Sequence, residues 1–179
     1  MKKNKRGVSP LIATVLIIGF TIVLAAMIMM WGTDLVKGIQ EQTSKSSEIK
    51  LTCSSKLTEL QVKAKKNKDT DTYTVTVNNA NDVDLAGFIF RLYDTEGTNV
   101  QAFDTHTDSN LKKIKVGDKS LEGLKGDALD AARGVPAFGV KTFKFSSPGF
   151  EVVKVGVFPK VMIQDVAETC SNEVKARVG

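Results

Sequence analysis

The order of hydrophobic and polar residues divides the chain into two unlike regions. From Val8 to Trp31, 24 consecutive residues carry no charged side chain, and Ser9, Thr14 and Thr21 supply the polar groups. A helix of that length spans about 36 Å, more than a hydrocarbon core of about 30 Å. A core helix of a soluble domain has a wider polar stripe. The pattern therefore predicts a membrane-spanning helix, with Trp31 as an interfacial anchor.

The helix is expected to continue beyond Trp31 to about Ser47 as a polar stalk. Leu35 and Ile39 lie one turn apart among charged residues, which leaves a narrow apolar seam. Residues 44–47 are rich in serine and predict a soft junction with the region that follows.

From about Ile49 the hydrophobic period changes to two, which indicates strands with one buried face. A short helix is expected at Asp127–Arg133, ended by Gly134. The predicted strands are 60–64, 73–77, 88–92, 113–116, 141–145, 152–157 and, as the last one, 161–163. The predicted fold class is α+β, in which a long N-terminal hydrophobic helix precedes an antiparallel β-sandwich head of immunoglobulin-like character.

The net charge of +5 is unevenly placed. Four positive charges, on Lys2, Lys3, Lys5 and Arg6, precede the apolar run, so the remainder is close to neutral. The basic side predicts a cytoplasmic N-terminus and an extracellular head. The lysine cluster at 63–68 is followed by acidic residues and is interpreted as a solvated turn. No nucleic-acid partner is expected.

The residues before the apolar run indicate a processing site. A secretory signal has an apolar core of about 7–15 residues followed by small residues at its cleavage site. Here the run is longer, and residues 24–27 match such a site poorly. Instead, Lys5, Arg6 and Gly7 lie directly before Val8. Glycine keeps the backbone accessible to a protease at the cytoplasmic face.

Residues 5–21, KRGVSPLIATVLIIGFT, resemble the class III signal sequence of archaeal type IV pilin precursors. The resemblance implies cleavage between Gly7 and Val8 by a membrane aspartyl prepilin peptidase, followed by delivery to a pilus assembly platform. It also implies three parts, a cleaved leader at 1–7, a hydrophobic helix and stalk at 8–50, and an extracellular head at 51–179.

In that family the subunit is held in the membrane before assembly and then forms a homo-polymer through its N-terminal helices. Bacterial relatives usually carry a glutamate at the fifth mature position, which is Ile12 here, so the sequence is closer to archaeal members. The residues expected to pack in the filament are Val8, Pro10, Leu11, Ile12, Val15, Ile18, Gly19, Ile22, Ala26 and Trp31.

Two cysteines, Cys53 and Cys170, frame the head. Outside the cell a disulfide can persist, and this pair would tie the C-terminal region to the base of the head. The alternative is a pair of free, buried thiols.

The sequence offers little chemistry. Its one histidine, His106, excludes histidine-rich metal sites. The polar stretches 81–87 and 104–110 do not match standard calcium loops. No Gly-Lys-Ser/Thr follows Gly123 or Gly126, which excludes a phosphate loop of that kind. No cofactor and no enzymatic activity are expected.

Three functions remain in competition. The first is a structural subunit of a surface filament that displays its head for adhesion. The second is a minor pilin-like, membrane-anchored surface protein whose head binds a ligand. The third is an uncleaved single-pass membrane protein with an extracellular β-domain.

Overall fold

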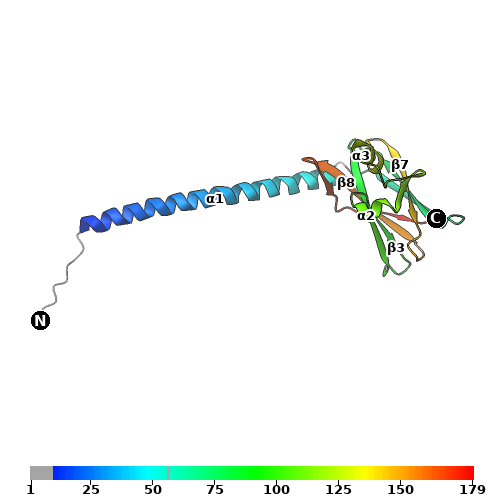
Figure 1. Cartoon of the computed structure of the whole chain (residues 1–179), viewed down its shortest axis with the longest axis horizontal. Helices are drawn as coiled ribbons and strands as arrows, with labels where there is room; N and C mark the ends of the chain where they lie inside the picture. Colours follow the sequence, from blue (N-terminus) through cyan, green and yellow to red (C-terminus); the bar gives the residue numbers. More distant parts are fainter. Residues whose placement is uncertain (1–9, 56) are drawn as a thin grey trace. The chain divides into compact units, whose positions relative to one another are not determined.

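The computed structural model describes residues 10–55 and 57–179 (Figure 1). The chain divides after Lys45 into two compact units, and the second unit covers Ser46–Gly179. The described residues form a long N-terminal apolar helix followed by antiparallel β-sheets. The α+β class predicted from the sequence is therefore confirmed.

Helix α1 spans Pro10–Ser55 and extends beyond the predicted end near Ser47. The expectation that strand periodicity begins at Ile49 is wrong, because the first strand starts at Leu60. Ile49 and Cys53 are four residues apart and so share one helix face. Cys53 belongs to the core of the head and Ile49 packs against it. Burial of this face stabilises the last turns as helix.

The strands form two sheets, in the orders β1-β2-β7-β5-β6 and β10-β8-β3-β4, with β9 paired to β8. All their ladders are antiparallel. The first sheet contains β1 (Leu60–Asn67), β2 (Thr72–Asn79), β5 (Ile114–Val116), β6 (Lys119–Ser120) and β7 (Val140–Ser146). The second contains β3 (Leu85–Tyr93), β4 (Val100–Asp104), β8 (Lys154–Ile163), β9 (Val166–Thr169) and β10 (Val174–Arg177).

The described residues also form two short helices, α2 (Asp108–Leu111) and α3 (Asp127–Arg133). The predicted helix at Asp127–Arg133 is confirmed. Sequence analysis missed α2 and the strands β4, β6, β9 and β10. These strands are short or lack strict alternation, and neighbouring strands rather than local pattern hold them in place.

The predicted strands 152–157 and 161–163 are one strand, β8, and the expectation that the last strand ends at Ile163 is wrong. Proline inside a central strand is unusual because it lacks an N–H donor. Here Pro159 of β8 is opposite Phe88 of β3. The N–H and C=O groups of Phe88 both bond to Thr105, which directly follows β4 on the other side of β3. The proline nitrogen therefore faces the outer side of β8, between the segments covered by β10 and β9.

Aromatic side chains from both sheets meet in one core. Phe88 and Phe90 of β3 contact Phe143 of β7 with ring centroids 5.4 and 4.9 Å apart, and Phe90 also lies 4.9 Å from Phe145. All four rings are fully buried. The alternation predicted for β2, β3 and β7 therefore turns their apolar faces towards a shared interior.

Truncation of this core tests the packing. We expect Phe90→Ala to lower the free energy of unfolding by about 3–5 kcal/mol, because it removes a ring from a filled interior. Val166→Ala, at a half-exposed position on β9, should change it by less than about 0.5 kcal/mol. Chemical denaturation of the full chain in non-ionic detergent measures both variants. Equal losses in the two would contradict the described core.

Candidate functional site

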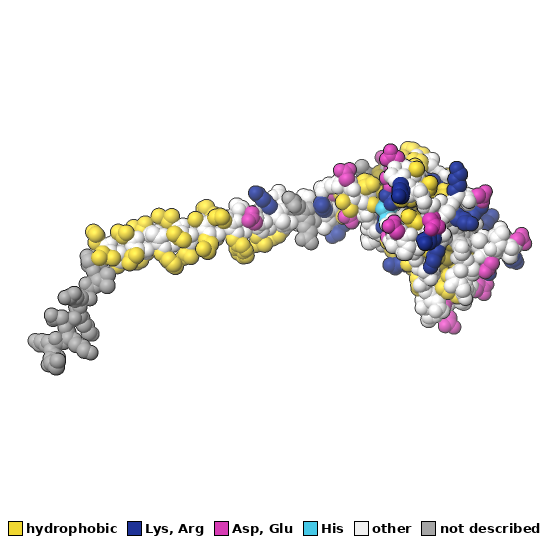
Figure 2. Space-filling view, in the orientation of Figure 1, with side chains coloured by type: hydrophobic (Ala, Val, Ile, Leu, Met, Phe, Trp, Pro, Cys, Tyr) yellow, Lys and Arg dark blue, Asp and Glu magenta, His cyan; other side chains and the backbone are white. Residues whose placement is uncertain are grey.

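The apolar part of α1 is an exposed surface. Leu11 and Trp31 retain 74% and 70% of their accessible area. The other predicted packing residues described as exposed are Ile12, Val15, Ile18, Gly19, Ile22 and Ala26. Figure 2 shows hydrophobic side chains along the visible face of this segment. By length and composition, α1 can cross a membrane. Exposure of such a surface to water is unfavourable by roughly 25 cal/mol per Å², so an apolar environment stabilises it.

The polar groups within this segment are satisfied by the helix itself. The hydroxyl groups of Thr14, Thr21 and Thr33 donate hydrogen bonds to the carbonyl oxygens three residues earlier, at 2.9, 2.9 and 3.0 Å. In a medium without water, an unsatisfied hydroxyl costs several kcal/mol. These internal bonds remove that cost, a feature that sequence analysis did not identify.

Small residues leave room for close helix approach. A side chain added at Gly19 or Gly32 would meet no atom within 4 Å. Gly32 also lies in a shallow apolar depression with Met29, Thr33 and Val36. Absence of side-chain bulk lets a neighbouring helix approach closely and gain van der Waals contacts.

The predicted processing site lies before the first residue of α1. Lys5, Arg6, Gly7 and Val8 are outside the described residues, so the cut between Gly7 and Val8 stays a prediction. Pro10 is the first residue of α1. Proline suits a first helical turn, whose N–H groups have no partner within the helix.

Cys53 and Cys170 form a disulfide, so of the two alternatives the bridge is confirmed. Their Cα atoms are 5.5 Å apart across 117 residues of sequence, and both side chains are buried. The backbone is held on both sides, because Asn172 donates to the Cys53 carbonyl at 3.4 Å and the Cys170 N–H donates to Pro159 at 2.9 Å. The bridge thus fixes the end of α1 to the second sheet.

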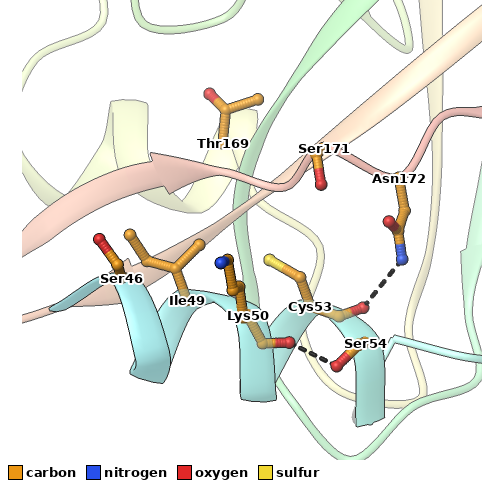
Figure 3. A pocket seen from close by; sticks show the side chains of 8 residues that line it. All are labelled: Ser46, Ile49, Lys50, Cys53, Ser54, Thr169, Ser171 and Asn172. Carbon is orange, nitrogen blue, oxygen red and sulfur yellow. Dashed lines mark hydrogen bonds between the residues drawn. The ribbon is translucent and has the colours of Figure 1, made fainter. Parts of the chain in front are cut away.

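A pocket of about 470 Å³ lies beside this bridge (Figure 3). The last turns of α1 form one wall, and the segment after β9 forms the other. Ile49 and Cys53 supply apolar surface, while Ser171 and Asn172 supply polar groups. Lys50, Ser46 and Ser54 also line the pocket, so its wall offers an ammonium group and hydroxyl groups beside the apolar surface.

His106 lies in a half-buried cluster of charges between β4 and α3. Burial, with the positive charges of Arg133 and Lys160, lowers its pKa to about 4. Asp104 accepts hydrogen bonds from the backbone N–H of His106 and from the Lys160 ammonium, both at 2.8 Å. Gly87 makes room for the ring, because a Cβ there would collide with the imidazole. The histidine is therefore neutral at pH 7 and packed as a structural group.

The polar stretch 81–87 forms a bend that leads into β3, and the stretch 104–110 passes from β4 through a turn into α2. Side chains in and beside the first stretch hold the backbone. Asn79 is buried and donates to the carbonyl oxygens of Val83 and Pro136 at 2.8 and 3.0 Å. Asp84 accepts from the Ala137 N–H at 2.7 Å. Within residues 10–55 and 57–179, no three His, Cys, Asp or Glu side chains gather where they could hold a metal ion.

Comparison with known proteins adds no relative: no family model matches the chain, and no curated protein matches it.

Loss of the disulfide tests its role. We expect Cys53→Ser to lower the free energy of unfolding by about 4 kcal/mol, because the unfolded chain regains the freedom of a loop of this size. Cys170→Ser and the double variant should lose about as much, since each breaks the same bond. Denaturation with and without reductant provides the measurement. A stable Cys53→Ser chain beside an unstable Cys170→Ser chain would contradict a shared bridge.

The low pKa of His106 predicts a dependence of stability on pH. Below about pH 6.5 the unfolded histidine binds a proton, whereas the folded one does so only near pH 4. The free energy of unfolding should therefore fall by about 2 kcal/mol between pH 7 and pH 5. His106→Gln should flatten that slope, and Asp108→Asn, at an exposed neighbouring position, should keep it. Denaturation at pH 7, 6 and 5 measures the slopes, and an unchanged slope in His106→Gln would overturn the assignment.

Proposed function

We propose that this chain is the precursor of a structural subunit of a type IV pilus-like surface filament. It polymerises through the apolar part of α1 and displays the β-rich head outside the cell for adhesion. The observation that carries the proposal is the uncharged run from Val8 to Trp31, which directly follows Lys5, Arg6 and Gly7 in the sequence and whose described side chains are exposed. The role is structural, without catalysis and without a cofactor.

Before assembly, the helix holds the precursor in the cytoplasmic membrane. The four basic residues of the first six place the N-terminus in the cytoplasm, where a prepilin peptidase cuts after Gly7. The head is then on the opposite side of the membrane. The Cys53–Cys170 bridge supports this location, because disulfides persist in oxidising surroundings.

After release from the membrane, the same surface must be covered again. Copies of α1 packed side by side bury it, and the small residues Gly19 and Gly32 permit close contact. The internal hydrogen bonds of Thr14 and Thr21 suit both surroundings, since neither lipid nor a helix core supplies water. Ile12 provides no charge to fix the register, so side-chain packing sets it.

For the head we propose a β-sandwich of immunoglobulin-like character. The contacts of Phe88 and Phe90 with Phe143 support it, because they join the inner faces of two antiparallel sheets. A rigid head of this kind keeps its outer surface constant while the helix passes from membrane to filament.

A second candidate is a minor pilin-like, membrane-anchored protein that binds a ligand without forming the main filament. The pocket of about 470 Å³ beside the disulfide favours it. Electron microscopy separates the two, because the first predicts continuous fibres built from this chain and the second predicts a membrane species without incorporation.

Replacement of the residue before the cut tests the proposal. We expect Gly7→Leu to block processing and filament assembly, because a bulky side chain hinders access of the peptidase to the backbone. Asn4→Ala, a leader change away from the cut, should process normally. N-terminal sequencing and intact mass of membrane-derived protein give the readout, with Val8 expected as the first residue. Met1 retained in wild-type filaments, or normal fibres from Gly7→Leu, would contradict the proposal.

A further inference from the structure

The outer face of the first sheet carries lysine and hydroxyl side chains in register. Alternate residues of β2 and β7 are buried, which turns Thr72, Thr74, Lys144 and Ser146 outward. Thr72 is paired with Ser146, and Thr74 with Lys144. Lys144 is paired in turn with Lys115 of β5, so the row continues across three strands. Directly paired residues of an antiparallel ladder project on the same side.

This face is hollowed into a pocket of about 350 Å³. Thr72, Thr74 and Ser146 contribute hydroxyl groups, and Lys113, Lys115 and Lys144 contribute ammonium groups. Thr70 lies at the rim, with its hydroxyl 2.7 Å from that of Thr72. The lining therefore combines positive charge with groups that both donate and accept hydrogen bonds.

The charges of the pocket are not balanced within the chain. Asp118 is the single acidic residue of the lining, and it is paired with Lys144 at 2.7 Å. That contact, together with the charge of Lys115, lowers the pKa of Asp118. The Lys113 ammonium makes no hydrogen bond or ion pair with any of the residues that the structure describes. The pocket lining therefore has three lysines and one acidic residue, an excess of two positive charges.

Stability does not account for this arrangement. Like charges that lie directly opposite each other in a ladder are unfavourable, and Lys115 and Lys144 are such a pair. The unit from Ser46 to Gly179 as a whole has nearly equal numbers of acidic and basic residues, so the excess is local. A bound anion would remove the repulsion and complete the hydrogen bonds of the hydroxyl groups.

We propose that this lysine and threonine pocket binds an acidic polysaccharide, through its sulfate or carboxylate groups and its sugar hydroxyls. Lysine ammonium groups pair with the anionic groups, and the threonine hydroxyls bond to the sugar. A nucleic acid fits less well, because single strands need exposed aromatic surfaces for stacking. Phe145, the aromatic residue of the lining, is fully buried. The site rests on the proposed function only in requiring a head displayed outside the cell.

Titration of the full chain in non-ionic detergent tests the site. The probes are a labelled heparin hexasaccharide, uncharged maltohexaose and a single-stranded DNA of the same net charge, at about 0.15 M salt. We expect the sulfated sugar to bind, and the other two to bind at least tenfold more weakly. Equal binding of DNA would overturn the assignment to a polysaccharide, and absence of binding by the sulfated sugar would overturn the site.

Variants locate the binding surface. Lys115→Gln and Lys113→Gln should each weaken binding about tenfold, since each removes a hydrogen bond to a charged group. Thr74→Val should weaken it about threefold at nearly constant shape. Lys125→Gln removes the same charge from an exposed position outside the pocket and should change binding less than twofold. Equal effects of Lys115→Gln and Lys125→Gln would overturn the pocket as the site.

The outcome is separable from that of the filament proposal. The titration uses dispersed subunits and does not require assembly, so Gly7→Leu should bind the hexasaccharide as well as wild type. Gly7 lies outside the head, so loss of binding in Gly7→Leu would contradict a site formed by the head alone. Absence of fibres with retained sugar binding would contradict the filament and leave the pocket supported.

Discussion

The apolar surface of α1 is exposed in the described chain, and this constraint determines which surroundings suit the protein. An isolated helix with exposed Leu11, Ile18 and Trp31 is not stable in water as a monomer. Lipid and a bundle of apolar helices are environments that would satisfy it, and both favour a helix that is hydrophobic all round. The satisfied threonine hydroxyls and the open glycines are consistent with either environment.

The head is stabilised by its own contacts, which include those made by the last turns of α1. Its stability comes from the aromatic contacts between the two sheets and from the bridge between Cys53 and Cys170. The bridge also attaches the last turns of α1 to the second sheet, where Asn172 bonds to the Cys53 carbonyl. The backbone at the end of α1 is thus held by covalent, polar and apolar contacts together.

Some polar side chains of the head stabilise the fold, whereas those of the lysine and threonine pocket remain available to bind a ligand. Asp104 bonds to both the His106 backbone and Lys160, and Asn79 donates to two backbone carbonyls. These polar groups therefore have their partners within the head. The lysines around Thr74 are different, because the chain supplies a single acid to them. That contrast separates a structural cluster from a candidate binding surface.

The sequence alone determined the features that depend on local pattern. An uncharged run of 24 residues predicts a helix long enough to cross a membrane, and alternation in β2 and β3 identifies buried faces because side chains alternate across a strand. The helix at Asp127–Arg133 followed from its own residues.

Tertiary structure decided the rest, because those features depend on contacts between distant residues. The extension of α1 to Ser55 requires burial of Ile49 and Cys53 against the head. The choice of a disulfide over free thiols requires that segments 117 residues apart meet. Lys115 and Lys144 are neighbours only through the pairing of β5 with β7. Such proximity comes from strand order, which no local pattern specifies.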